Sequence, residues 1–446
     1  MYDCIVVGGG LAGLTAARQL RLAGKKLLLL EAKTHTGGRV ITERYQEDTK
    51  LDLGAQWIGP GQDRIYQLCR EMDVRLIPSY HTGRSSLYLN KKLRHYKGLI
   101  PPLPLLSLWQ LHRGLKRINA RARQVPLEQP WAAPEAFAWD TQTAGEWIRA
   151  NLPNEKARTL FQLAFEAIFA AHPDEVSLLH SLFYIHSGGG MESLMEMRGG
   201  AQQDRFLHGA GRLSESLQLM LYDDLRIRSA VTGIAQDADG VTVNGAGFTF
   251  KARKLIVAVP PPVVNKIHFE QPLPARRVQL QQEQFMGSVM KCFAVYNEPF
   301  WRKKRLNGMC ALPGETVSLI FDCSPPNACK GVLVGFVLAS RARELLELYP
   351  RQRQQLVLEC FSRFAGPAAL DCEYYTDKSF ETEPWALGCY AGLMPPGTLT
   401  ATGEALRTPC GHIHWAGTET SPVWNGYMEG AVRSGERAVR EVLALL

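Results

Sequence analysis

The stretch Tyr2–Leu30, YDCIVVGGGLAGLTAARQLRLAGKKLLLL, decides the fold. Tyr2–Val7 is a short apolar run that ends in glycine, which is typical of a strand buried in a parallel sheet. Leu14–Leu22 has the apolar spacing of a helix that packs on a sheet, and Gly24 follows it as a stop signal. Lys26–Leu30 is a second apolar run. The sequence therefore predicts a strand–helix–strand unit at the N-terminus.

A glycine-rich turn joins the first strand to the helix. Gly8, Gly10 and Gly13 have the GxGxxG spacing. The first glycine allows a tight turn, the second lets the backbone approach a pyrophosphate, and the third lets the helix pack close to the strand. Glu31 ends the second strand, where an acidic side chain accepts a hydrogen bond from a ribose hydroxyl. The turn predicts a dinucleotide site with these candidate contacts: Gly8, Gly10, Leu11, Ala12, Gly13, Glu31, Ala32 and Lys33.

The motifs that follow favour FAD over NAD. Gly37-Gly38-Arg39 comes soon after Glu31, and Leu51–Trp57 reads LDLGAQW. A second Gly-Gly-Arg after the acidic residue is a mark of large FAD oxidoreductases, and Arg39 can pair with the pyrophosphate as a bidentate donor. We therefore expect FAD as the cofactor, with these further contacts: Gly38, Arg39, Gly54, Ala55, Gln56 and Trp57.

The composition excludes several classes of protein. The chain has 446 residues, of which 46% are hydrophobic and 21% charged, as in a globular protein of two or three domains. The net charge is +8, but no basic run is interleaved with aromatic residues, so we expect no nucleic-acid partner. The ten cysteines form no CxxC pair, and His412 and His414 have no third ligand in the pattern. We therefore expect no metal site.

The sequence also bears on location. No basic segment precedes an apolar run at the N-terminus, and no apolar stretch is long enough to span a bilayer. We expect a cytoplasmic protein without an integral membrane anchor. Leu99–Leu111 is apolar but short and broken by prolines. We expect it to pack in the core rather than to line an entrance or touch a membrane surface.

The middle of the chain alternates between helical and strand patterns. Helices are predicted at Leu105–Arg123, Thr143–Ala150 and Glu155–Ala171. Strands are predicted at Ser288–Tyr296 and Val332–Leu338. A hairpin is predicted within 241–250, with its turn at Asn244-Gly245. The last strand and helix are expected at His412–Ala416 and Gly426–Leu446.

This alternation predicts a discontinuous two-domain α/β fold. A Rossmann-like FAD-binding domain is expected to comprise residues 1–76, 206–280 and 383–446. A mixed α+β substrate-binding domain of sheet plus helices is expected to comprise residues 77–205 and 281–382.

The chain resembles the flavin-containing monoamine oxidase family over nearly its whole length. The matching blocks are GGGLAGLTAARQL (8–20), GGRV (37–40), LDLGAQWIGP (51–60), GGAQQDRF (199–206), GSVMKCFAVYNEPFWRKK (287–304), GCY (388–390), PPG (395–397) and AGTETSPVWNGYMEGAVRSGERA (416–438). The resemblance implies the glutathione-reductase/amine-oxidase type of FAD fold. It also implies oxidation of an amine, with O2 as the electron acceptor and hydrogen peroxide as a product.

The resemblance assigns the catalytic candidates Lys291, Tyr390 and Tyr427. Lys291 looks like the family lysine that holds a water beside flavin N5, where a cation favours electron transfer to oxygen. Tyr390 and Tyr427 look like the two walls of an aromatic cage that guides the amine towards the flavin. Cys389 matches the cysteine that carries a thioether to the flavin in mammalian-type enzymes, and a free buried cysteine is the alternative.

The remaining assignments also come from the resemblance. Gly417, Thr418 and Glu419 are expected at the ribityl chain or the pyrophosphate. Gly426, Tyr427 and Met428 open the last helix, whose N–H groups stabilise an anionic reduced flavin. Val231 is expected at the adenine end, while Lys33 replaces an arginine that is frequent in the family. The substrate-pocket candidates are Gln202 (with Gln203 as the neighbouring alternative), Leu319 and Ile168.

A primary monoamine with an apolar or aromatic body is the expected substrate. A diamine or polyamine oxidase would have acidic residues along its tunnel, and an L-amino-acid oxidase would have an arginine for the substrate carboxylate. A non-enzymatic binding module of the GDP-dissociation-inhibitor type is the alternative from another class. The family also suggests a homodimer. The chain ends at Leu446 without the hydrophobic anchor of the membrane-bound relatives, which favours a soluble enzyme.

Overall fold

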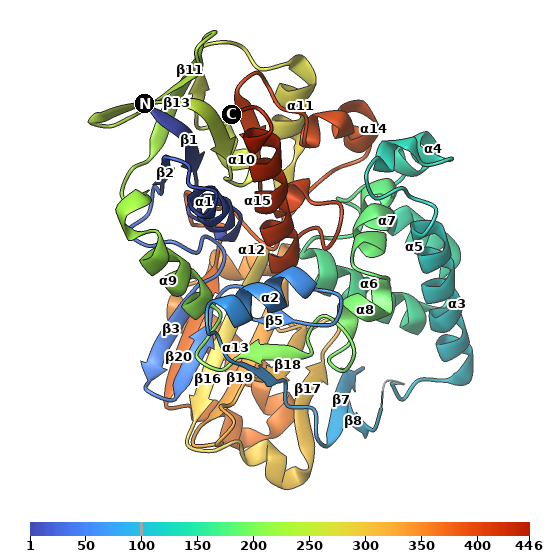
Figure 1. Cartoon of the computed structure of the whole chain (residues 1–446). Helices are drawn as coiled ribbons and strands as arrows, with labels where there is room; N and C mark the ends of the chain where they lie inside the picture. Colours follow the sequence, from blue (N-terminus) through green and yellow to red (C-terminus); the bar gives the residue numbers. More distant parts are fainter. Residues whose placement is uncertain (99–100) are drawn as a thin grey trace.

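The N-terminal strand–helix–strand unit forms as predicted and contributes two neighbouring strands to the first sheet (Figure 1). The computed structural model describes residues 1–98 and 101–446. β1 (Tyr2–Val7), α1 (Leu11–Leu22) and β2 (Leu27–Leu30) follow one another, and β1 pairs in parallel with both β2 and β13 (Phe248–Val257). Because β1 has a strand on each side, its residues from Cys4 to Val7 are fully buried.

The strand order of the first sheet is β10-β2-β1-β13-β12-β11-β14, with β22 paired to β13. The strands not yet given are β10 (Leu225–Arg226), β11 (Val231–Gln236), β12 (Val241–Gly245), β14 (His268–Phe269) and β22 (Ile413–Trp415). Its parallel centre combines the first residues, the middle and the last part of the chain.

The predicted hairpin turn at Asn244-Gly245 is wrong by two residues. In the structure Asn244 and Gly245 belong to β12 and pair with Thr249 and Phe248 of β13. Gly247 takes the positive φ of 76° that the turn requires. Because the turn lies two residues later, β12 and β13 form more backbone hydrogen bonds, and this longer ladder is more stable than the predicted shorter hairpin.

The last helix covers the first sheet beside α1 (Figure 1). α15 runs over Met428–Leu443 and packs so closely on α1 that a Cβ at Gly435 would lie 2.4 Å from the carbonyl oxygen of Ala12. The start of α15 therefore lies near the glycine-rich turn, although the two are separated by most of the chain.

The second sheet has the order β20-β16-β19-β18-β17-β7-β8. Its strands are β7 (Arg84–Leu89), β8 (Lys92–Tyr96), β16 (Val289–Tyr296), β17 (Leu306–Ala311), β18 (Leu319–Asp322), β19 (Gly331–Leu338) and β20 (Tyr374–Ser379). Every residue of β16 and β19 is buried, which explains the uninterrupted apolar runs that predicted them.

Short strands connect the two sheets or flank them. They are β3 (Thr42–Gln46), β4 (Thr49–Asp52), β5 (Trp57–Ile58), β6 (Leu76–Pro78), β9 (Asp204–Phe206), β15 (Phe285–Met286) and β21 (Gly392–Leu393). Helices of the periphery are α2 (Asp63–Glu71), α9 (Gly211–Met220), α10 (Pro261–Val264), α11 (Ala275–Glu283), α12 (Ser340–Leu346), α13 (Pro350–Ala365) and α14 (Thr398–Thr402).

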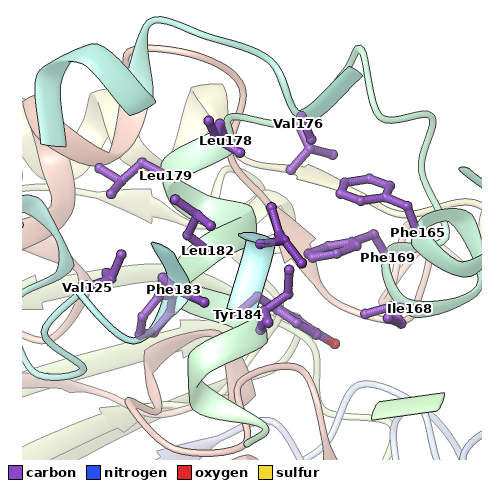
Figure 2. Close-up of a cluster of buried hydrophobic side chains, with 14 of the residues drawn as sticks. Val125, Phe165, Ile168, Phe169, Val176, Leu178, Leu179, Leu182, Phe183 and Tyr184 are labelled. Carbon is purple, nitrogen blue, oxygen red and sulfur yellow. The ribbon is translucent and has the colours of Figure 1, made fainter. Parts of the chain in front are cut away.

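A helical layer stands beside the sheets and has its own apolar core (Figures 1 and 2). It consists of α3 (Leu105–Ala122), α4 (Ala136–Asp140), α5 (Ala144–Asn151), α6 (Glu155–Phe169), α7 (Leu178–Ser187) and α8 (Met191–Met195). Thr143 and Glu146 form a capping box that starts α5. The rings of Phe169 and Tyr184 lie 4.8 Å apart, which places Tyr184 at the edge of this core.

The expectation that Leu99–Leu111 packs in the core is wrong for most of its helical part. Residues 99 and 100 lie outside the described residues. Leu105 is 86% exposed, Leu106 60% and Trp109 55%, because they sit on the outer face of α3. Leu111 lies on the inner face and lines the large cavity described below.

None of the helices in the described part of the chain is long and apolar enough to cross a membrane.

Candidate active site

The glycine-rich turn leaves no room for side chains at two of its positions. Gly8 has a φ of 103°, which favours glycine. A Cβ at Gly13 would lie 1.9 Å from the carbonyl oxygen of Gly8, so this glycine lets α1 start directly on β1. At Gly10 the nearest atom to an added Cβ is 4.0 Å away. Gly10 therefore faces open space, as a backbone that a ligand approaches would.

The carboxylate of Glu31 is fixed on this turn. Its two oxygens accept hydrogen bonds from the backbone N–H groups of Gly9 (2.6 Å) and Lys33 (2.8 Å). The residue is only 6% exposed and lines the cavity. Glu31 is thus held in a defined position at the mouth of the turn, where it can meet a ribose.

A cavity of about 510 Å³ extends from the glycine-rich turn to the second sheet and the helical layer. Every site residue predicted from the sequence lines it, except Gly13 and Glu419. Gly13 packs beneath the turn instead, and Glu419 lies behind Arg39. The structure therefore brings the dinucleotide motif, Lys291, the two tyrosines and the substrate-pocket candidates to one space.

Arg39 and Glu419 form an ion pair below the cavity wall. Arg39 Nη1 donates to Glu419 Oε1 and to the carbonyl oxygen of Tyr390, both at 2.7 Å. Burial by itself would raise the pKa of Glu419, but the Arg39 guanidinium outweighs it and holds this pKa below its ordinary value. The carboxylate is charged, and the guanidinium is oriented by it.

Lys291 projects from β16 into the wall of the cavity. Its Nζ donates to the carbonyl oxygens of Asp52 (2.5 Å) and Gly54 (2.8 Å) and to Oε1 of Gln56. Burial lowers the pKa of Lys291 to about 8, while the charge of Asp52 acts in the opposite direction. The lysine is thus a buried cation beside the cavity that can lose its proton in mildly alkaline solution.

Tyr390 and Tyr427 stand in the cavity wall on the two segments that follow Gly388 and Gly426. Burial raises the pKa of both phenols, so both are neutral over the physiological range. Tyr427 is the N-cap residue of α15, so the free N–H groups of this helix start at the same wall. Cys389 lies next to Tyr390, and burial raises the pKa of its thiol to about 12.

Several residues of the cavity carry no signal in the sequence. Tyr184 is fully buried, and its ring lies 6.1 Å from that of Tyr427. Gly426 is required here, since a Cβ would come 2.3 Å from the Tyr184 hydroxyl. Lys266, Phe336 and Trp385 also line the cavity. Tyr184 sits in an ordinary apolar helix pattern, so no motif signals it.

The glycine-rich turn, Glu31 and the cavity together define a dinucleotide-binding protein with room for a second ligand beside the dinucleotide. The family model for flavin containing amine oxidoreductases matches residues 11–443. A relative from Dictyostelium discoideum, named "Probable flavin-containing monoamine oxidase A", is 36% identical over 99% of this chain and 97% of its own length. The flavin-containing amine oxidase B of Sus scrofa is 35% identical over 99% of this chain and 86% of its own.

Solved structures agree with these relatives. Cyclohexylamine oxidase from Brevibacterium oxydans superposes with a TM-score of 0.95 at 31% identity, covering 100% of this chain and 99% of that one. Putrescine oxidase bound to putrescine superposes with a TM-score of 0.95 at 28% identity, covering 99% of each chain. The chain belongs to the flavin-containing amine oxidoreductase family. It is a FAD-dependent enzyme that oxidises amines, and the open turn at Gly10 with Glu31 beside it fits this cofactor.

Proposed function

We propose that this enzyme oxidises a primary monoamine with an apolar or aromatic body. The observation that carries the proposal is the lining of the cavity beyond the tyrosines. It consists mainly of apolar side chains from α6, α8 and the second sheet, among them Leu160, Leu163, Ala164, Ile168, Met195, Leu319 and Phe336. Such a surface favours an uncharged substrate body and disfavours a second ammonium group.

The charged groups of the cavity argue against a diamine. Among the described residues that line it, the charged ones are Glu31, Lys33, Arg39, Lys266 and Lys291. Glu31 is the one carboxylate in this set, and it is bonded to the glycine-rich turn. A diamine would leave its distal ammonium without a partner, which is costly in an apolar site.

The same set argues against an amino acid as substrate. Arg39 is engaged by Glu419, and Lys33 by Glu383 at 3.1 Å. Lys266 donates to the carbonyl oxygen of Pro384 at 2.6 Å. Because these cations already have partners, binding a substrate carboxylate would require breaking one of these contacts.

The roles of the chain's residues in this reaction follow from their positions. FAD, when bound, supplies the two-electron acceptor for the amine and passes the electrons to O2. We assign to Tyr390 and Tyr427 the orientation of the amine nitrogen between their electron-rich faces. Apolar burial favours the neutral amine, whose lone pair is needed for imine formation. The imine then hydrolyses to the aldehyde.

Three further assignments belong to the same proposal. We assign to the Lys291 cation the stabilisation of negative charge that develops on oxygen. Gln202 would contact the substrate body, and Cys389 would be the attachment point if the flavin is covalently held.

We also propose that the chain divides into two domains, one of residues 1–76, 206–280 and 383–446 and the other of residues 77–205 and 281–382. This division is supported by the first sheet drawing its strands from the former ranges and the second sheet from the latter.

A comparison of amines tests the substrate class. Peroxide formation would be measured with benzylamine, pentylamine, putrescine and phenylalanine at equal oxygen. The proposal requires kcat/KM for benzylamine or pentylamine to exceed that for putrescine and phenylalanine by at least about tenfold. A preference for putrescine would replace the monoamine by a diamine. A yellow protein that turns over none of them would overturn the proposed monoamine substrate.

A further inference from the structure

Lys291 is held by three acceptors, and just one of them belongs to a side chain. Two are the carbonyl oxygens of Asp52 and Gly54, and the third is Oε1 of Gln56. An ammonium has three N–H donors, so this set satisfies the whole group. The backbone acceptors are fixed by the tight packing of Gly54, where a Cβ would lie 2.1 Å from the carbonyl oxygen of Arg39. Of the three acceptors, the Gln56 amide is therefore the one that an amino-acid substitution can remove.

Gln56 is itself anchored on its far side. It is 4% exposed, and its Nε2 donates to Sγ of Cys323 at 3.2 Å. Cys323 is fixed by its backbone N–H, which donates to the carbonyl oxygen of Val332 at 2.8 Å. With the amide nitrogen committed to sulfur, the amide oxygen faces Lys291. Gln56 thus connects the lysine of β16 to the link between β18 and β19.

Gln56 also lies in the wall between two cavities. On one side is the large cavity, and on the other is a space of about 30 Å³ lined by Asp52, Arg205 and Cys323 among others. A polar space of this size is sufficient for about one or two water molecules. Replacing Gln56 by leucine, which has a similar volume, removes the acceptor and keeps the wall closed.

We propose that Gln56 is a positioning residue for the reaction with oxygen, because it fixes the Lys291 ammonium at the cavity wall. The inference rests on the proposed function, in which Lys291 stabilises charge on oxygen. Gln56 acts through Lys291 and not on the amine. Its loss is therefore expected to affect the oxygen step and to leave the oxidation of the amine nearly unchanged.

The groups around Lys291 determine in which direction a substitution of Gln56 shifts the pKa of the lysine. The groups that face its ammonium are the Asp52 carboxyl, the Cys323 and Cys389 thiols and the rings of Trp57, Phe293 and Phe336. Gln56 adds a neutral acceptor that favours the charged lysine. Leucine in its place lowers the lysine pKa further, whereas glutamate adds a carboxylate and raises it.

The variants Gln56→Leu, Gln56→Met and Gln56→Glu test the inference, with Lys291→Met as reference. Gln62→Leu is the matched control, because Gln62 is 0% exposed, lines neither cavity and has no hydrogen-bond partner for its side-chain amide among the described residues. The holoenzymes are reduced with dithionite, mixed with O2, and followed by their visible absorbance. Reduction by benzylamine is measured separately. The absorbance of the oxidised holoenzymes is also titrated with pH, and FAD content and melting temperature report on folding.

We expect the oxygen rate constant of Gln56→Leu and Gln56→Met to fall at least about tenfold, with amine reduction within about threefold of wild type. The pH-dependent absorbance change that Lys291→Met abolishes moves to lower pH in Gln56→Leu and to higher pH in Gln56→Glu. Gln62→Leu matches wild type. A wild-type oxygen rate in Gln56→Leu, or equal losses in both steps with loss of FAD, overturns the inference. Because dithionite replaces the amine, failure of benzylamine to reduce the enzyme would refute the substrate proposal alone.

Discussion

Arg39 and Glu419 form an ion pair across 380 positions of the chain, with 2.7 Å between Nη1 and Oε1. The Glu419 side chain is 3% exposed and that of Arg39 19%. The same guanidinium holds the carbonyl oxygen of Tyr390, and the same carboxylate accepts from the N–H of Gly392 at 3.1 Å. The pair therefore ties the N-terminal Gly-Gly-Arg motif to both C-terminal segments of the cavity.

Breaking this pair from one side is expected to be costly. Glu419→Leu leaves the Arg39 guanidinium without its counter-charge, which costs about 3–5 kcal/mol of unfolding free energy. Urea unfolding measures the loss. The control is Glu215→Gln, whose ion pair with Arg44 is exposed and contributes about 1 kcal/mol at most. Equal stabilities for Glu419→Leu and the wild type would mean that the pair is not a structural tie.

Two glycines of the turn are expected to respond differently to alanine. Gly13→Ala drives a Cβ into the Gly8 carbonyl and disrupts the fold itself. Gly10→Ala finds open space in the protein, so the stability of the apoprotein should change by no more than about 0.5 kcal/mol. Its FAD affinity should nevertheless fall, because the methyl group occupies the space of the pyrophosphate. Thermal melting of the apoproteins and FAD titration separate the two cases, and unchanged FAD affinity in Gly10→Ala would contradict the proposed site.

Lys291 should make the stability of the protein depend on alkaline pH. Burial lowers its pKa from 10.5 to about 8 in the folded chain. Between these values the unfolded chain binds more protons at this residue, so the folded state gains stability as the pH rises through this window. Below about pH 8 Lys291 is charged in both states, so the folded state bears the full cost of burying that charge. In Lys291→Met this gain is absent, and unfolding curves of the two proteins between pH 7 and 10 measure the difference. If the stabilities of the wild type and Lys291→Met change with pH in the same way, burial does not lower the pKa of Lys291.

An acidic side chain in the apolar lining should change the substrate preference. Leu319→Asp places a carboxylate on β18 at the cavity surface, where it can pair with a distal ammonium. The ratio of kcat/KM for putrescine to that for benzylamine is expected to rise at least about tenfold, partly because an apolar substrate would strip water from the carboxylate without pairing it. Leu319→Asn is the uncharged control. An unchanged ratio would remove Leu319 from the substrate pocket.

The sequence was sufficient to predict the elements with strong local signals. The strand–glycine turn–helix unit at residues 2–22 and the buried strand around Lys291 both formed where their apolar patterns placed them. The hairpin turn was misplaced because Asn244-Gly245 has the better local turn signal, whereas the longer ladder that ends at Gly247 depends on pairing energy.

Contacts between distant segments could not be predicted in the same way. Neither the Arg39–Glu419 pair nor the approach of Tyr184 to Tyr427 follows from any local pattern. The apolar run at Leu99–Leu111 was misread because apolar composition does not distinguish a core face from a cavity lining or an exposed face. Such errors arise where tertiary structure decides the environment of a side chain.

The reduction of the bound FAD by an amine without oxygen tests most directly whether the enzyme oxidises monoamines. The visible spectrum of the anaerobic holoenzyme would be recorded with benzylamine, and then in separate samples with putrescine and phenylalanine. We expect rapid loss of the oxidised flavin absorbance with benzylamine, its return with formation of peroxide when air is admitted, and slow or no loss with putrescine and phenylalanine. Faster bleaching by putrescine, or a flavin that stays oxidised with all three, would contradict it.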